Sequence, residues 1–150
     1  RGWERRSTAR AHAGMASVAF VEADAATYDF QPVFDLAFSR FGVMFFDDPV
    51  AAFTNLRTAL AKGGKLAFVC WRDFPENIWA FAPYESALEL LPPQEPMHPN
   101  APGPFAFADG ARVRSILTEA GFHDIVVKPH ATTVNMGATT GEAVTEALTI

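Results

Sequence analysis

The chain of 150 residues contains a single cysteine, Cys70, so it cannot form an internal disulfide bond. It also lacks an apolar run of about 20 residues, the length that a helix needs to cross a bilayer, and it shows no recognisable signal peptide. These absences predict a protein without a membrane span that is located in the cytoplasm. We expect Cys70, inside an apolar segment, to act as a small core hydrophobe.

Basic residues are few, with 12 Lys and Arg against 17 Asp and Glu and a net charge of −5. This balance argues against a domain held to nucleic acid by its overall field. The local exception is a group of four arginines near the start, Arg1, Arg5, Arg6 and Arg10. We expect them to form the solvated face of an Ala-rich helix rather than a phosphate-binding surface.

Several motifs of binding and catalysis are absent as well. The sequence contains neither GxGxxG nor GxxxxGK[ST], so it shows no phosphate cradle of either common kind. Ser39 lacks the flanking glycines of a GxSxG nucleophile elbow. The four histidines, His12, His98, His123 and His130, are scattered without the short spacings of a metal site, so we predict no metal.

The segment from Phe34 to Trp71 has the pattern of a strand, a helix and a second strand. Its beginning, Phe34 to Phe38, is apolar at almost every position, which predicts a strand covered on both faces. A right-handed crossover places both strands in one parallel sheet. Ligands of such sheets bind beyond the carboxyl ends of the strands, so the residues after Ser39 and Trp71 are the candidates for function.

The helix of this unit carries its own start and stop signals. Asp48 is a suitable cap and Pro49 a suitable first residue. One apolar stripe of the helix recurs at helical spacing: Val50, Phe53, Leu56 and Leu60. We predict that Gly63 and Gly64 end the helix and that the second strand runs from Lys65 to Trp71.

The flanking segments predict further elements of one domain, residues 1–150. Before the unit we expect a helix over Trp3 to Met15 and a strand over Ser17 to Glu22. After it we expect a helix beginning beyond Pro75, a loop or lid over Pro92 to Pro104, a helix capped by Asp109, and an antiparallel hairpin of strands Phe122 to Val127 and Thr132 to Met136.

Four stretches carry a family resemblance, namely VEADAATYDF, FDLAFSRFGVMFF, DDPVAAFTNLRTALAKGGKLAFVCWR and the later AGF. In this order they resemble the C-terminal two-thirds of a class I S-adenosylmethionine-dependent methyltransferase, of the type 11 group that includes ubiquinone and menaquinone methyltransferases. The resemblance implies a Rossmann-like α/β fold, mostly parallel with a late antiparallel hairpin. The family's glycine-rich loop and its ribose-binding acidic residue have no counterpart. We therefore expect a fragment truncated on the N-terminal side, with its C-terminal helix cut.

The resemblance implies S-adenosyl-L-methionine as the cofactor and assigns residues to it. Asp24 and Ala25 are expected to contact the adenine, and Ser39, Arg40 and Phe41 to lie beside the methionine portion. Independently of the family, a carboxylate can accept a hydrogen bond from an exocyclic amine while the next backbone N–H donates to a ring nitrogen. The alternative is that Asp24 only caps a turn.

The implied reaction is in-line transfer of a methyl group to a small-molecule acceptor. Trp71, Arg72 and Trp79 are candidates to border the acceptor pocket, although aromatic residues at helical spacing more often belong to a core. No catalytic residue is assigned. His130 is a conceivable base, but a solvated or structural role is the more frequent one for such a histidine. Two alternatives remain open, an NAD-dependent oxidoreductase of similar fold and a non-catalytic interaction module.

Overall fold

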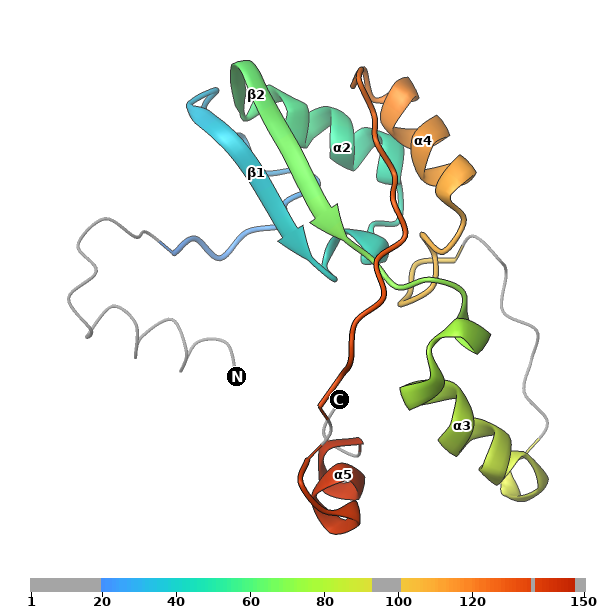
Figure 1. The fold of residues 1–150 in the computed structure, drawn as a ribbon. Coiled ribbons are helices and arrows are strands. Elements are labelled where there is room, and N and C mark those ends of the chain that lie inside the picture. Colours follow the sequence, from blue (N-terminus) through green and yellow to red (C-terminus); the bar gives the residue numbers. More distant parts are fainter. Residues whose placement is uncertain (1–19, 93–100, 136, 148–150) are drawn as a thin grey trace.

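The computed structural model describes residues 20–92, 101–135 and 137–147. The elements in chain order are β1 (Phe34–Arg40), the 3₁₀ turn η1 (Val43–Phe45), α2 (Pro49–Thr58), β2 (Leu60–Val69), η2 (Phe74–Glu76), α3 (Ile78–Ala87), η3 (Leu88–Leu90), α4 (Gly110–Glu119) and α5 (Thr140–Ala147). Figure 1 shows α2 and α4 beside the two strands, with α3 and α5 lying away from the sheet. The predicted helix Trp3 to Met15 lies outside the described residues.

The two strands form the expected parallel pair. Leu36 lies opposite Lys65 and Arg40 opposite Val69, with an irregularity in the register between Phe34 and Leu36. The connecting helix α2 begins as predicted, because the Asp48 carboxylate accepts a hydrogen bond from the Ala51 backbone N–H at 2.9 Å. The strand–helix–strand unit is therefore confirmed, and it belongs to a small parallel α/β arrangement.

The prediction that Gly63 and Gly64 end the helix is wrong. Helix α2 already ends at Thr58, and both glycines lie inside β2, which runs from Leu60 to Val69 instead of Lys65 to Trp71. Gly63 has a φ of 82°, and a Cβ atom on Gly64 would lie 2.9 Å from the Phe34 carbonyl oxygen. The glycines therefore permit the close, irregular start of the strand pair rather than a helix cap.

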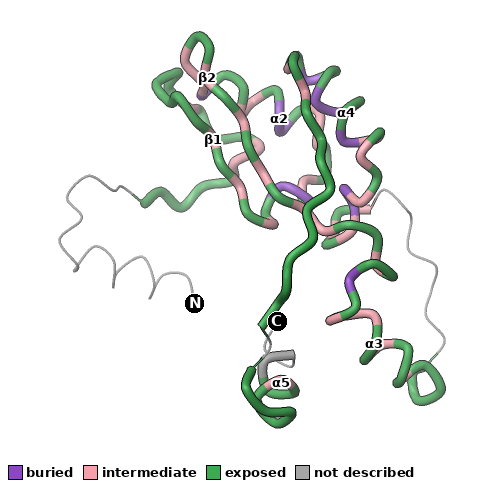
Figure 2. Tube along the Cα trace, in the orientation of Figure 1, coloured by how far each residue is buried: buried purple, intermediate pink, exposed green. Residues whose placement is uncertain are grey.

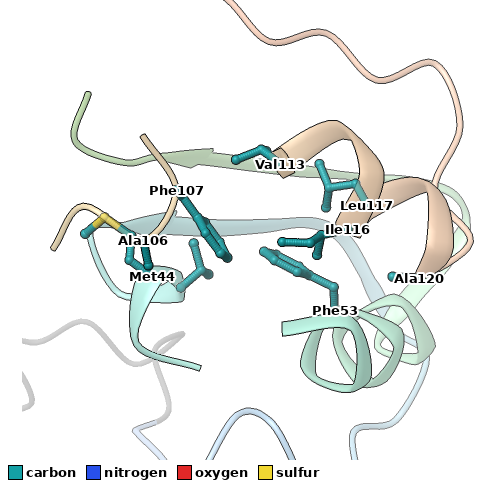
Figure 3. Packing of buried hydrophobic residues seen from close by; sticks show 9 residues of the cluster. Met44, Phe53, Ala106, Phe107, Val113, Ile116, Leu117 and Ala120 are labelled. Atoms are coloured by element: carbon teal, nitrogen blue, oxygen red, sulfur yellow. The ribbon is translucent and has the colours of Figure 1, made fainter. Parts of the chain in front are cut away.

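The hydrophobic core lies on one side of the sheet, between the strands, α2 and α4 (Figure 3). Phe53 of α2 is fully buried, and its ring centroid lies 5.5 Å from that of Phe68 and 6.0 Å from that of Phe107. The other large members of the cluster come from η1 and α4: Val43, Met44, Val113, Ile116 and Leu117. One core thus joins β2, α2, α4 and the segment before α4.

The prediction that the first strand is covered on both faces is wrong in the described structure. Phe34, Leu36 and Phe38 are 48%, 55% and 67% exposed, whereas the alternate positions Ala37 and Ser39 are half-buried. Figure 2 shows β1 mostly exposed along its length. Because α2 and α4 pack on one face only, the apolar side chains on the other face of β1 remain uncovered by described residues.

The predicted late hairpin is also not found in the described part of the chain. Residues 122–135 contain no strand, and Val126 and Val134 are 72% and 43% exposed. Only Phe122 and Ile125 of this segment pack against the core. An extended segment becomes a strand when a neighbour accepts its backbone hydrogen bonds, and no ladder pairs these residues with one another. The predicted Ser17 to Glu22 strand likewise has no strand geometry over its described residues 20–22.

We expect Phe53 to be the most costly core residue to truncate. Phe53→Ala should lower the free energy of unfolding by about 3–5 kcal/mol, since a buried ring is lost and a cavity is left. Urea denaturation followed by circular dichroism measures this change. The matched control is Phe45→Ala, which removes a 54% exposed ring and should cost only about 0.5 kcal/mol. Equal losses for the two variants would contradict the assignment of the core.

We also expect the exposed face of β1 to promote association of the chain with itself, as an apolar strand with an open edge does. Sedimentation velocity should show a rise in apparent mass with protein concentration. Phe38→Thr, which removes the apolar ring but introduces a β-branched residue suited to a strand, should reduce that rise. Leu90→Thr is the control, because Leu90 is 86% exposed but lies on η3. A wild-type protein that stays monomeric at every concentration would contradict the expectation.

Candidate functional site

The carboxyl ends of β1 and β2 lie side by side, as the parallel register requires. The chain leaves β1 at Phe41, whose backbone N–H donates a hydrogen bond to the Val69 carbonyl at 3.1 Å. Phe41 has a φ of 60°, in the left-handed region. A residue with a Cβ atom adopts this region at a cost of about 1–2 kcal/mol, and such residues are concentrated at functional sites.

Three aromatic rings from different elements meet at this edge. The Phe41 and Trp71 rings are stacked, with centroids 4.1 Å apart and planes 9° apart. The Trp79 ring of α3 lies 5.1 Å from that of Trp71, at an interplanar angle of 48°. Phe41 and Trp71 also pack against the core. The structure thus brings together one residue predicted for the cofactor and two predicted for the acceptor, in a row that we call the aromatic row.

Trp79 carries an unusual polar group for such a row. Its indole Nε1 is buried, and no described residue accepts a hydrogen bond from it. A buried donor without a partner costs about 1–3 kcal/mol, so native proteins rarely keep one without a reason. A ligand atom that accepts a hydrogen bond is one such reason.

The other predicted residues at the strand ends are more exposed. The Arg40 guanidinium carbon lies over the Phe41 ring, 6.0 Å from its centroid. Arg72 forms an ion pair with Glu76, one helical turn further along the chain. Ser39 is half-buried, and a Cβ atom on Gly42 would lie 3.3 Å from its Oγ. Both arginines are therefore exposed, and each is next to a residue of the aromatic row in the chain.

Asn77 fixes the chain between Trp71 and α3, and the sequence did not single it out. Its side chain is buried, and its Nδ2 donates hydrogen bonds of 2.9 Å to the carbonyls of Arg72 and Asp73. These bonds hold the turn that carries Trp79 back towards Trp71. A polar residue directly before an apolar helix was the only signal for it.

Asp24 and Ala25 lie on a turn before β1. The Asp24 carboxylate accepts hydrogen bonds from the Ala26 backbone N–H at 2.9 Å and from the Thr27 hydroxyl at 3.2 Å. The turn is attached to α2, because Asn55 Nδ2 donates to the Ala25 carbonyl at 3.1 Å. Asp24 does cap a turn, and the described contacts join this turn to α2 rather than to the aromatic row.

Cys70 directly follows β2 and packs against the core, as expected of a small apolar residue. Its thiol donates to the Phe107 carbonyl at 3.5 Å, and burial raises the pKa of the thiol. Within the described residues, no group of three His, Cys, Asp or Glu side chains is arranged to hold a metal ion. A helix long and apolar enough for a bilayer is not found in that part of the chain either.

Comparison with known families adds an independent finding. Residues 4–68 match the model of a protein family described as the methyltransferase domain. This segment is similar to methyltransferase domains. The match confirms the resemblance to class I S-adenosylmethionine-dependent enzymes, whose domains have a Rossmann-like α/β fold. Neither the search of curated proteins nor that of solved structures found a match.

The matched segment includes some of the candidate site residues and leaves out others. It contains the five that the sequence assigns to the cofactor: Asp24, Ala25, Ser39, Arg40 and Phe41. It ends before the three assigned to the acceptor: Trp71, Arg72 and Trp79. The family match therefore bears on the cofactor side of the aromatic row, and the acceptor side depends on the geometry of this chain.

We predict that Cys70 reacts slowly with iodoacetamide at pH 8, because its thiolate fraction is lowered by burial. The raised pKa also has a consequence for stability. Since the folded state disfavours the thiolate, stability is full below the ordinary pKa of a thiol and falls as the pH rises above it. Alkylation rates in native buffer and in urea measure the difference. Equal rates in both would contradict it.

Proposed function

We propose that the chain is part of an enzyme that transfers a methyl group from S-adenosylmethionine to a small-molecule acceptor. The observation that carries this proposal is the methyltransferase-family match over the strand whose carboxyl end bears the strained, stacked Phe41. When bound, the cofactor supplies an activated methyl group on a sulfonium. The chain in this proposal is one partial methyltransferase domain.

The Asp24 turn suits an adenine edge. An ionised carboxylate has about four acceptor sites, and Asp24 uses two of them within its own turn. The remaining capacity accepts a hydrogen bond from an exocyclic amine, and the Ala25 N–H donates to a ring nitrogen. Asn55 attaches the turn to α2 by donating to the Ala25 carbonyl. Capping a turn and reading an adenine are therefore compatible roles for Asp24.

The residues after β1 hold the methionine portion in this proposal. The exposed Arg40 guanidinium pairs with the carboxylate of the methionine portion, because a guanidinium can donate two parallel hydrogen bonds to a carboxylate. Ser39 Oγ lies next to Gly42, where the small residue leaves room beside the hydroxyl. The fixed backbone of Phe41 sets the position of both side chains relative to the aromatic row.

Trp71, Arg72 and Trp79 border the acceptor in this proposal. The two indole rings exclude water, Arg72 is exposed and paired with Glu76, and the unpaired Trp79 N–H donates to an acceptor oxygen or nitrogen. Alignment of the reactants supplies most of the rate enhancement, up to about 7–11 kcal/mol in intramolecular reactions, so no protein nucleophile is required. A non-catalytic module is the second candidate, favoured by the aromatic stacking that fills this edge.

Calorimetric titration of S-adenosylhomocysteine into the full-length protein tests the proposal. We expect binding, and we expect Asp24→Ala to weaken it about tenfold or more, because a hydrogen bond to a charged group is worth about 1.5–3 kcal/mol. Asp24→Asn is the control: it keeps the oxygen that caps the turn and removes the charge.

The outcomes of the titration separate the two parts of the proposal. Absence of binding by the wild-type protein would contradict the methyltransferase function and favour the non-catalytic module. Equal affinity of the wild type and both variants would leave the function standing but remove Asp24 from the site. Loss of affinity in Asp24→Ala with full retention in Asp24→Asn would assign Asp24 to the turn alone.

A further inference from the structure

The Phe41 ring has one face covered and the other turned towards a cation. Trp71 stacks on it at 4.1 Å, nearly parallel, which leaves the opposite face for other groups. The Arg40 guanidinium lies over the ring, 6.0 Å from the centroid. An aromatic face attracts a cation within about 6 Å because its quadrupole is negative there. The ring at the end of β1 is thus placed as a cation-binding surface.

The two forms of the proposed cofactor differ in charge at one atom. S-adenosylmethionine carries a sulfonium cation, and S-adenosylhomocysteine a neutral thioether. Their carboxylates and adenines are the same. We propose that Phe41 binds the sulfonium through its open face and so distinguishes the methylated cofactor from the demethylated product. This inference rests on the proposed function and deepens it.

The backbone and the stacked partner hold the ring in place for this contact. The Phe41 N–H donates a hydrogen bond to the Val69 carbonyl, and its ring is stacked on that of Trp71. A ring fixed in advance loses little conformational entropy when a ligand binds. Arg40 is exposed, so its guanidinium can leave the ring and pair with the ligand carboxylate without leaving a buried charge. The guanidinium and the sulfonium therefore compete for one face.

Because of the charge difference, the contact with Phe41 weakens when the methyl group is transferred. In the transfer, the bond from sulfur to the methyl carbon breaks as the bond from the acceptor atom to that carbon forms. The electron pair of the broken bond stays on sulfur, which becomes neutral, and the proton of the acceptor passes to solvent. The contact with Phe41 is then lost, so the product is held less tightly than the substrate.

The test replaces Phe41 with fluorinated phenylalanines of nearly the same shape. Fluorine withdraws charge from the ring face, so affinity for S-adenosylmethionine should fall with each added fluorine, by about 3- to 30-fold at three. Affinity for S-adenosylhomocysteine should stay within about twofold, because a neutral thioether has no such attraction. Titration calorimetry with the two ligands measures both. The same replacement at Phe45, on η1, is the control and should change neither affinity.

A second variant, Arg40→Gln, keeps the proposal testable if the replacements at Phe41 disturb folding. Arg40→Gln removes the charged partner of the carboxylate that both ligands carry, and that loss changes both affinities equally. Because a cation that competes for the Phe41 ring is removed, the ratio of S-adenosylmethionine affinity to S-adenosylhomocysteine affinity should rise. An unchanged ratio, or a fluorine effect equal for both ligands, would overturn the role of Phe41 and leave the methyltransferase proposal intact. Failure of the wild type to bind either ligand would overturn both.

Discussion

The structure depends on the burial of one ring, Phe53, at the place where four segments meet. It contacts Phe46 after η1, Phe68 of β2 and Phe107 before α4, with centroids between 5.5 and 6.0 Å from its own. Helix α2 would have no firm attachment to the sheet without this contact, because its other fully buried residue is the small Ala52.

This core is one-sided, and the two faces of the sheet consequently have different roles. On the covered side the packing continues past the strand ends into Phe41, Cys70 and Trp71, so the aromatic row is an extension of the core. The proposed site would therefore rest on side chains that pack against the core. On the other side of β1, apolar side chains are not covered by described residues. Burying them under a further layer of protein would stabilise the fold through the hydrophobic effect.

Local signals were sufficient where a residue acts on its neighbours and insufficient where its partner is distant. The cap at Asp48 and the parallel strand pair could be predicted, because capping and apolar patterning are written within a few residues. The two glycines fitted a helix end and a strand irregularity equally well, and only the approach of the Phe34 carbonyl decides between them. Asn55 was missed for the same reason, because it bonds the Ala25 carbonyl on a turn that the sequence does not place near α2. Asn77 was missed although the carbonyls that it bonds, those of Arg72 and Asp73, lie close before it in the chain.

The placement of glycine around the end of β1 argues that the ring of Phe41 is needed. Phe41 takes a φ of 60°, where glycine would be free of strain, whereas Gly42 takes a φ of −99°, which any residue adopts. Gly42 has a steric reason, since a Cβ atom there would crowd Ser39 Oγ at 3.3 Å. No comparable steric reason explains Phe41. A glycine at this position would relieve the strain but remove the ring that stacks on Trp71. The chain therefore keeps a strained backbone in order to hold an aromatic face at the carboxyl edge of the sheet, where ligands of parallel sheets bind.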